Sequence, residues 1–144
     1  MGAIASGGVR LLNHEVVDGL GIPGELIEQV ARREEVELER RERLYRGSRP
    51  PVSLSNKTVI LTDDGLATGS TMRAAVAAIR RQEPAGIIVA VPVGAPSTCD
   101  EMRDVADDVV CLRTPEPFVA VGLWYRDFSE TSDAEVRELL GRTD

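Results

Sequence analysis

Residues 59–71 read VILTDDGLATGST, an apolar run that ends in two adjacent aspartates and continues as a stretch of small residues. A short apolar run bounded by turn-forming residues predicts a buried β-strand. The small residues leave backbone N–H groups accessible, as in loops that lead from a strand into a helix. The stretch therefore predicts a strand, a ligand-binding loop and a helix in succession.

The rest of the C-terminal half repeats this alternation. We expect strands at 58–62, 87–91 and 108–112 and helices at 72–81 and 97–106. Strands and helices at this spacing predict βαβ units, and so an α/β fold with a Rossmann-like parallel sheet and flanking helices. Because the strands are continuously apolar, we expect helices on both faces of the sheet.

A last helix is expected over residues 132–142. Ser132 stands at its N-cap and Glu135 follows three positions later, which is the capping-box arrangement.

The N-terminal part has a different character. The apolar runs GAIA (2–5) and VRLL (9–12) are separated by Ser6, Gly7 and Gly8, which predicts a β-hairpin. A helical period then starts after Pro23 and runs to about residue 45. Of the 15 residues 32–46, 11 are charged with both signs mixed, so we expect a solvent-exposed helical arm.

Residues 47–56 (GSRPPVSLSN) have the composition of a linker. At 144 residues the chain is long enough for one core, so we expect a single domain over 1–144. Within it, residues 1–56 form the hairpin, the arm and the linker, and residues 57–144 form the βαβαβ core.

Composition excludes several classes of partner. With 17 basic and 24 acidic residues, the net charge of −7 argues against nucleic acid and anionic membranes. The sequence has neither a membrane-spanning run of roughly 18 apolar residues nor a signal peptide, which predicts a cytoplasmic protein.

The two cysteines, Cys99 and Cys111, have no metal-binding spacing, and the single histidine, His14, has no partner histidine. Burial as small apolar side chains is favoured for both cysteines over a reactive role.

The chemistry is expected in the loop that follows the apolar run 59–62. Ligands of parallel sheets bind beyond the carboxyl ends of the strands. Small residues and a helix N-terminus can hold a phosphate there without a basic side chain. Asp63 and Asp64 then need hydroxyl hydrogens or a cation beside that phosphate, and a ribose 5′-phosphate, alone or with Mg²⁺, supplies them. The alternative is a capped turn in which the two aspartates only bond the next helix.

The stretch VILTDDGLATGSTMRAAV resembles the phosphoribosyl-pyrophosphate (PRPP) binding motif of the type I phosphoribosyltransferases. The segments GAIASGGVRLLN, ERRERLYRG and TPEPFVAVGLWYRDFSETSDAEV resemble a bacterial family of predicted phosphoribosyltransferases. The resemblance implies that Asp63 and Asp64 hold the ribose hydroxyls and, with them, Mg²⁺. It also implies a 5′-phosphate site made of Ala67, Thr68, Gly69, Ser70 and Thr71.

The implied activity belongs to nucleotide metabolism. Ribose 5-phosphate would pass from PRPP to a small nitrogenous acceptor, such as a purine-like base, with release of pyrophosphate. The resemblance assigns no catalytic residue to this chain. The alternative is a non-catalytic PRPP- or nucleotide-binding regulatory protein, or an inactive fragment.

Type I enzymes also have a strand, a helix and a pyrophosphate-binding loop ahead of the segment that resembles this chain. We therefore expect an N-terminally truncated form of their fold that lacks the first strand and helix. The sheet edge exposed in this way is compatible with a homodimer.

Two further features bear on the acceptor. Ala67 stands where enzymes acting on hypoxanthine and guanine carry an acid, which disfavours a 6-oxopurine. Four of the five aromatic residues fall between Phe118 and Phe128. By resemblance Phe118 is the first base-stacking candidate, with Trp124 and Tyr125 beside it; a plug that closes the core is the equally weighted alternative.

Overall fold

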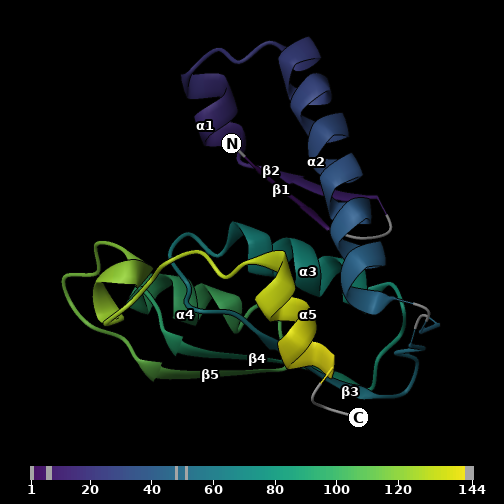
Figure 1. Ribbon diagram of the computed structural model, residues 1–144. Helices are drawn as coiled ribbons and strands as arrows, with labels where there is room; N and C mark the ends of the chain where they lie inside the picture. The colour runs from purple at the N-terminus through teal and green to yellow at the C-terminus, as the bar shows by residue number, and fades with distance from the viewer. Residues whose placement is uncertain (1, 6–7, 48, 51, 142–144) are drawn as a thin grey trace.

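A computed structural model describes residues 2–5, 8–47, 49–50 and 52–141 (Figure 1). Strands β3 (Thr58–Thr62), β4 (Gly86–Val93) and β5 (Asp108–Arg113) form a parallel sheet in the order β3-β4-β5. Thr58 pairs with Gly86, and Ile88 pairs with Asp108. The predicted strands and their parallel arrangement are confirmed.

Helices α3 (Ser70–Arg80) and α4 (Pro96–Met102) connect these strands and lie on the same face of the sheet (Figure 1). Alternate residues of β4 point toward these helices and are buried, because successive side chains of a strand point to opposite faces. The predicted helix 97–106 ends early, at Met102. The core between the sheet and the helices comprises Leu66, Met72, Val76, Ile87, Val89, Val91, Cys99, Met102, Ala106 and Val109.

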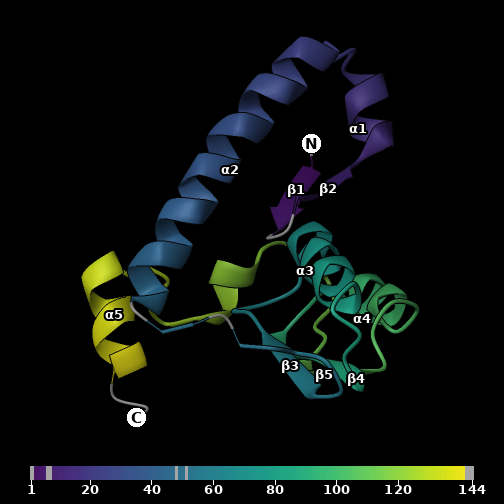
Figure 2. The same ribbon diagram turned by 90° about the vertical axis from the view of Figure 1, so that its right-hand side faces the viewer.

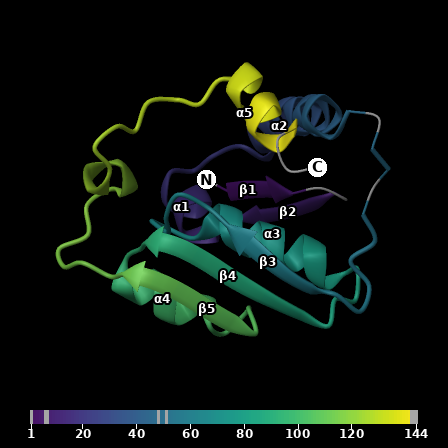
Figure 3. The same cartoon turned by 60° about the horizontal axis from the view of Figure 1, so that its bottom comes forward.

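The opposite face of the sheet is open, and the expectation of helices on both faces is wrong for the described residues (Figure 3). Ile60 is 62% exposed and Leu112 is 76% exposed on this face. A continuously apolar strand shows only that both of its faces could be covered. Both connecting helices, however, cross on one side of the sheet, so the second face keeps its apolar side chains in solvent.

The predicted hairpin is present. Strands β1 (Gly2–Ala5) and β2 (Val9–Leu12) pair antiparallel, with Ala5 opposite Val9. The hairpin packs on α3, on the side away from the sheet. Ala74 and Ala78 share one face of α3 and are buried outside the sheet core, as expected for small residues beneath a closely packed hairpin.

A short helix, α1 (His14–Gly19), follows the hairpin and was not predicted. The Asn13 side chain caps it by accepting a hydrogen bond of 3.0 Å from the backbone N–H of Val16. Six residues are too few to show a helical period, which is why the sequence did not reveal it.

Helix α2 (Gly24–Arg46) is the predicted charged arm (Figure 2). Ala31 is its only buried residue, and ion pairs such as Arg41–Glu37 and Arg43–Glu39 run along its surface. The arm is long, yet no helix among the described residues is both long and apolar enough to cross a membrane.

Helix α5 (Asp133–Gly141) packs against the C-terminal half of α2. The Tyr45 hydroxyl donates to Asp133 Oδ1 at 2.5 Å, and the Arg40 guanidinium donates to Asp133 Oδ2 at 3.1 Å. The capping box is confirmed, because the N–H of Ser132 donates to Glu135 Oε2 at 2.8 Å and the N–H of Glu135 donates to Ser132 Oγ at 3.3 Å. Residue 142 of the predicted helix lies outside the described residues.

The one-sided core makes a prediction about stability. Ile87 is 0% exposed and Ile60 is 62% exposed. We expect Ile87→Ala to lower the free energy of unfolding by about 2–5 kcal/mol, the usual range for truncation of a buried isoleucine. The matched Ile60→Ala should lower it by less than about 1 kcal/mol, because little burial is lost. Denaturant unfolding of the two variants measures the difference, and similar losses would show that the open face is covered in solution.

Candidate functional site

The loop after β3 is held against the sheet by an extension of the β3–β4 ladder. Leu66 and Gly94 form an isolated parallel bridge beyond the ends of the two strands. The N–H of Leu66 donates to the carbonyl oxygen of Val93 at 2.9 Å, and the N–H of Ala95 donates to that of Leu66 at 2.8 Å. The Leu66 side chain is 1% exposed in the core. The loop is therefore anchored at its centre, and the residues on either side of Leu66 are placed relative to β4.

The two aspartates lie in the turn between β3 and this anchor. The backbone N–H of Asp64 donates to Asp63 Oδ1 at 2.9 Å, so one carboxylate oxygen of Asp63 stabilises the turn. Partial desolvation raises the pKa of Asp63, and the neighbouring charge of Asp64 adds to the rise, while the bond from the Asp64 N–H opposes it. The capped-turn alternative expects bonds from both carboxylates to the next helix, whereas this bond stays within the turn and engages only the carboxylate of Asp63.

The predicted phosphate loop follows Leu66. Gly69 has φ 69° and ψ 3°, a left-handed conformation, and it is the N-cap of α3. The hydroxyls of Thr68 and Ser70 are 3.3 Å apart at the start of the helix. The first N–H groups of a helix have no intrahelical acceptors and carry its positive dipole end. The loop and the start of α3 therefore bring hydroxyls and N–H groups together at the position where the sequence predicts a phosphate.

Thr98 on α4 supports this loop, and the sequence did not single it out. Its Oγ1 donates to the carbonyl oxygen of Ala67 at 2.7 Å, and it is the one buried polar residue among those described, at 7% exposure. A Cβ added at Gly69 would lie 2.8 Å from the Thr98 methyl carbon. A threonine near the start of an expected helix gives no signal of such a role, because the contact joins residues 31 positions apart.

The loops after β4 and β5 meet at the same edge of the sheet, as the parallel arrangement predicts. The N–H of Gly94 donates to the carbonyl oxygen of Arg113 at 3.1 Å. Beside this contact lies a cavity of about 630 Å³. It is lined by Ala95, Pro96, Ser97, Glu116, Pro117 and Phe118.

The aromatic segment contacts the aspartate turn. The Tyr125 hydroxyl donates to the backbone oxygen of Asp64 at 2.6 Å, and the Tyr125 and Phe128 rings pack with centroids 5.2 Å apart. Trp124, in the 3₁₀ helix η1 (Val121–Trp124), is 47% exposed. None of these three rings belongs to the buried core, and Phe118 is half-buried outside it, so the interpretation of the cluster as a core plug is wrong. The structure brings Tyr125 to the aspartates and Phe118 to the neighbouring cavity.

The acidic turn bears on metal binding. No group of three or more His, Cys, Asp or Glu side chains in the described part of the chain is arranged to hold a metal ion. Mg²⁺ does not need such a cage, since it is commonly bound by one or two carboxylates together with substrate phosphates and water. The pair Asp63 and Asp64 therefore fits a magnesium ion that arrives with a phosphorylated substrate.

The two cysteines occupy positions that fit the predicted role of small apolar side chains. Cys99 is buried at 1% exposure in the core, and Cys111 is half-buried. Burial, together with the neighbouring Cys111 thiol, raises the pKa of Cys99 to about 12. A thiol with so high a pKa stays protonated near neutral pH and is a poor nucleophile.

The sheet, the aspartate turn and the small-residue loop correspond to a known domain. The family profile described as "Phosphoribosyl transferase domain" matches residues 3–126, which include every candidate site residue. The chain belongs to this phosphoribosyl transferase domain family.

Named relatives agree with this assignment. The chain is 40% identical over 141 residues to "Putative phosphoribosyl transferase Rv0571c" of Mycobacterium tuberculosis H37Rv and, to the same extent, to its counterpart MT0597 in strain CDC 1551. The match covers 98% of this chain but only 32% of each relative, so the chain spans about a third of their length.

The fold also matches the crystal structure of TT1426 from Thermus thermophilus, with a TM-score of 0.74 and 34% sequence identity. That match covers 95% of this chain and 64% of the other. The arrangement of the phosphoribosyl transferase domain described above is therefore shared with a crystal structure.

The Thr98 contact makes a prediction about the loop. Thr98→Val keeps the shape of the side chain but removes the donor to Ala67, and we expect a loss of about 0.5–1.5 kcal/mol in unfolding free energy, the usual net value of one hydrogen bond. Binding of ribose 5-phosphate should also weaken, because the loop loses a support. Thr98→Ser keeps the hydroxyl and serves as the control. Denaturant unfolding and calorimetric titration measure both effects; a Val variant that binds as well as the Ser variant would contradict this role.

Proposed function

We propose that the chain carries the PRPP-binding site of a phosphoribosyltransferase, which transfers ribose 5-phosphate from PRPP to a small nitrogenous acceptor and releases pyrophosphate. One observation carries the proposal: the Leu66–Gly94 bridge fixes the backbone between Asp63 and Asp64 on one side and the helix-capping loop of residues 67–71 on the other. Carboxylates that accept ribose hydroxyls and N–H groups that receive a phosphate are then joined within one loop.

Each candidate residue has a distinct part in this proposal. Asp63 and Asp64 accept hydrogen bonds from the 2′- and 3′-hydroxyls of the ribose. The 5′-phosphate is bound by the loop residues, whose N–H groups and hydroxyls donate to it: Ala67, Thr68, Gly69, Ser70 and Thr71. In such transfers the protein mainly positions the reactants and stabilises developing charge, which is the work of fixed donors and acceptors.

Magnesium fits the same carboxylates. Bound with PRPP, Mg²⁺ would neutralise charge on the leaving pyrophosphate. Asp63 and Asp64 are the side chains that would hold it, directly or through water, while they orient the ribose.

The cavity beside Phe118 suits the acceptor. It opens where β4 and β5 end, and Ala95 on its wall is bonded to Leu66 of the anchored loop. Phe118 lines this cavity and is half-buried, and it is therefore the residue that we propose to stack on a planar base. Trp124 is a weaker stacking candidate because it is not among the residues that line this cavity. The acceptor is proposed only as a nitrogenous base, and Ala67 disfavours a 6-oxopurine.

A second candidate function is binding of PRPP or a nucleotide without transfer, in a regulatory role. It is compatible with the described loop, which offers groups to bind a ribose and its phosphate but in which no side chain is assigned a part in the transfer itself. A cytoplasmic location, a single domain over 1–144 and a homodimer stay predictions.

A substitution at Asp64 tests the proposed ribose site. We expect Asp64→Asn to weaken calorimetric binding of ribose 5-phosphate with Mg²⁺ by at least about tenfold, because charge-assisted hydrogen bonds to the hydroxyls are lost. Asp104→Asn, the same change at an exposed aspartate outside the loop, is the matched control. Equal binding by both variants would reject the site.

Pyrophosphate release from PRPP over a panel of bases then separates the two functions: turnover supports transfer, and binding without turnover supports the regulatory alternative.

The raised pKa of Asp63 makes a further prediction about pH. Ribose binding needs the ionised carboxylate, so affinity should be full above the pKa of Asp63 and fall as the pH drops through it. Because partial desolvation raises that pKa above the ordinary aspartate value, the loss should begin at a higher pH than for an ordinary exposed aspartate. Titrations of ribose 5-phosphate across the acidic range measure the midpoint. Asp63→Asn should bind ribose 5-phosphate more weakly and lose the part of the acidic transition that belongs to Asp63; a variant with both the affinity and the transition of the parent protein would contradict the assignment.

A further inference from the structure

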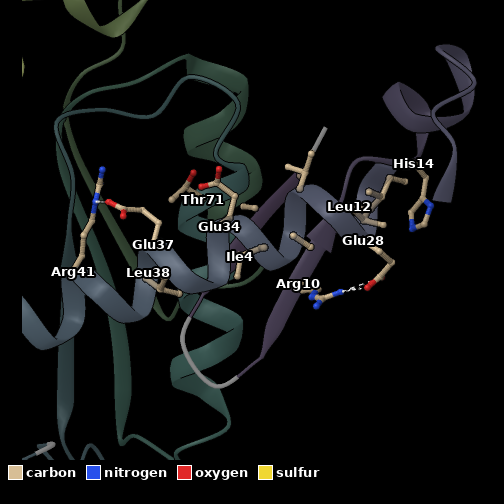
Figure 4. A pocket seen from close by; sticks show the side chains of 15 residues that line it. Ile4, Arg10, Leu12, His14, Glu28, Glu34, Glu37, Leu38, Arg41 and Thr71 are labelled. Carbon is tan, nitrogen blue, oxygen red and sulfur yellow. Dashed lines mark hydrogen bonds and ion pairs between the residues drawn. The ribbon is translucent and has the colours of Figure 1, made fainter. Parts of the chain in front are cut away.

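A second cavity lies away from the carboxyl edge of the sheet, between the β1–β2 hairpin and helix α2 (Figure 4). We call it the hairpin cleft. Its volume is about 650 Å³, within the range of roughly 300–1,000 Å³ typical of small-molecule sites. Apolar side chains line much of its wall, among them Ile4, Leu12, Ala31 and Leu38.

The arginines of the hairpin cleft are already neutralised. Arg10 reaches Glu28 at 3.0 Å and Glu35 at 2.8 Å, and these two carboxylates raise its pKa. Arg41 pairs with Glu37 at 2.7 Å, which likewise raises the pKa of Arg41. Both guanidiniums therefore already hold a carboxylate, Arg41 through its Nε alone and with Glu37 shared between it and Arg40.

Glu34 is the exception among the acids. It lines the hairpin cleft, and its side chain makes no hydrogen bond or ion pair within the described part of the chain. Figure 4 shows its carboxylate pointing toward the end of the cleft where Thr71 lies. The cleft wall carries three carboxylates, Glu28, Glu34 and Glu37, against two guanidiniums. Glu35 and Arg40 pair with these lining residues, which makes four carboxylates against three guanidiniums. The group as a whole therefore carries one excess negative charge, and Glu34 is its unpaired carboxylate among the described residues.

We propose that the hairpin cleft binds a small organic cation, with an amidinium, guanidinium or protonated amine on a compact apolar body. The apolar wall would take the body, and Glu34 would accept hydrogen bonds from the cationic head. A planar amidinium or guanidinium can donate two parallel hydrogen bonds to one carboxylate, the strongest arrangement for such a pair. The charge and the lining of the cleft thus specify the same class of ligand.

The hairpin cleft adjoins the proposed PRPP loop at Thr71 but does not include the ribose-binding carboxylates. Of the five residues proposed for the 5′-phosphate, only Thr71 lines it, and neither Asp63 nor Asp64 does. A phosphate in the cleft would face the carboxylate of Glu34 and would be repelled. A bare metal ion is not favoured either, since no metal-binding cluster exists among the described residues.

Calorimetric titration of the 144-residue chain with benzamidine and with benzamide tests the proposal. The two probes have nearly the same shape, but only benzamidine is charged. We expect benzamidine to bind at least about tenfold more tightly than benzamide, because only the amidinium gains charge-assisted hydrogen bonds. Equal binding of the two probes, or binding of neither, would overturn the proposal.

Two variants locate the site. Glu34→Gln should weaken benzamidine binding by about tenfold. Glu39→Gln, the same change on a face of α2 outside the hairpin cleft, should alter binding by less than about twofold. Glu34 is exposed, so the substitution should not unfold the chain, and a thermal melt checks this. Unchanged binding in folded Glu34→Gln would overturn the proposal.

A competition experiment keeps this proposal apart from the proposed function. Benzamidine should bind equally well in the Asp64→Asn variant and should not be displaced competitively by ribose 5-phosphate. Loss of ribose 5-phosphate binding in that variant with benzamidine binding retained supports two separate sites. Competitive displacement would place benzamidine in the PRPP loop and overturn the hairpin cleft as its site.

Discussion

The bridge between Leu66 and Gly94 is the constraint on which the candidate site depends. It continues the parallel pairing of β3 and β4 past the aspartates, with backbone bonds of 2.9 and 2.8 Å on the two sides of Leu66. The buried Leu66 side chain adds an apolar anchor. Without this attachment the loop would be flexible. Ligand binding would then have to order it, at a cost in conformational entropy. With it, the backbone that carries the two acids and the helix cap is positioned before a ligand binds.

The surroundings of the bridge show how closely the loop is packed. A Cβ at Gly65 would lie 2.8 Å from both the Val121 side chain and the Val93 carbonyl oxygen, and one at Gly94 would lie 2.6 Å from Cys99 Sγ. The aromatic segment therefore closes over the aspartate turn, while Thr98 supports the loop from α4. Glycine is required at these positions by the neighbours and not by backbone torsion, since neither residue has a positive φ.

The predictions from sequence succeeded where the signal was local. The strands, the hairpin, the charged arm and the capping box of α5 each depend on residues a few positions apart, and all are present. The length of α4, the short helix α1 and the core-plug alternative were missed or wrong. Helix ends and six-residue helices depend on capping and packing more than on period. The roles of Thr98 and Tyr125 could not be predicted, because their hydrogen bonds join residues 31 and 61 positions apart.

The amino-acid sequence by itself determined the order of the elements and the chemistry of the loop. An apolar run, two acids and a row of small residues specify a strand end, hydrogen-bond acceptors and an accessible backbone, and all three are local properties. Only the tertiary structure decided that one face of the sheet is open, that Phe118 lies at a cavity beside the anchored loop, and that Glu34 lines a cleft together with Thr71. These features depend on the side of the sheet on which the helices cross and on contacts between segments far apart in the chain. A local sequence pattern does not determine either of them.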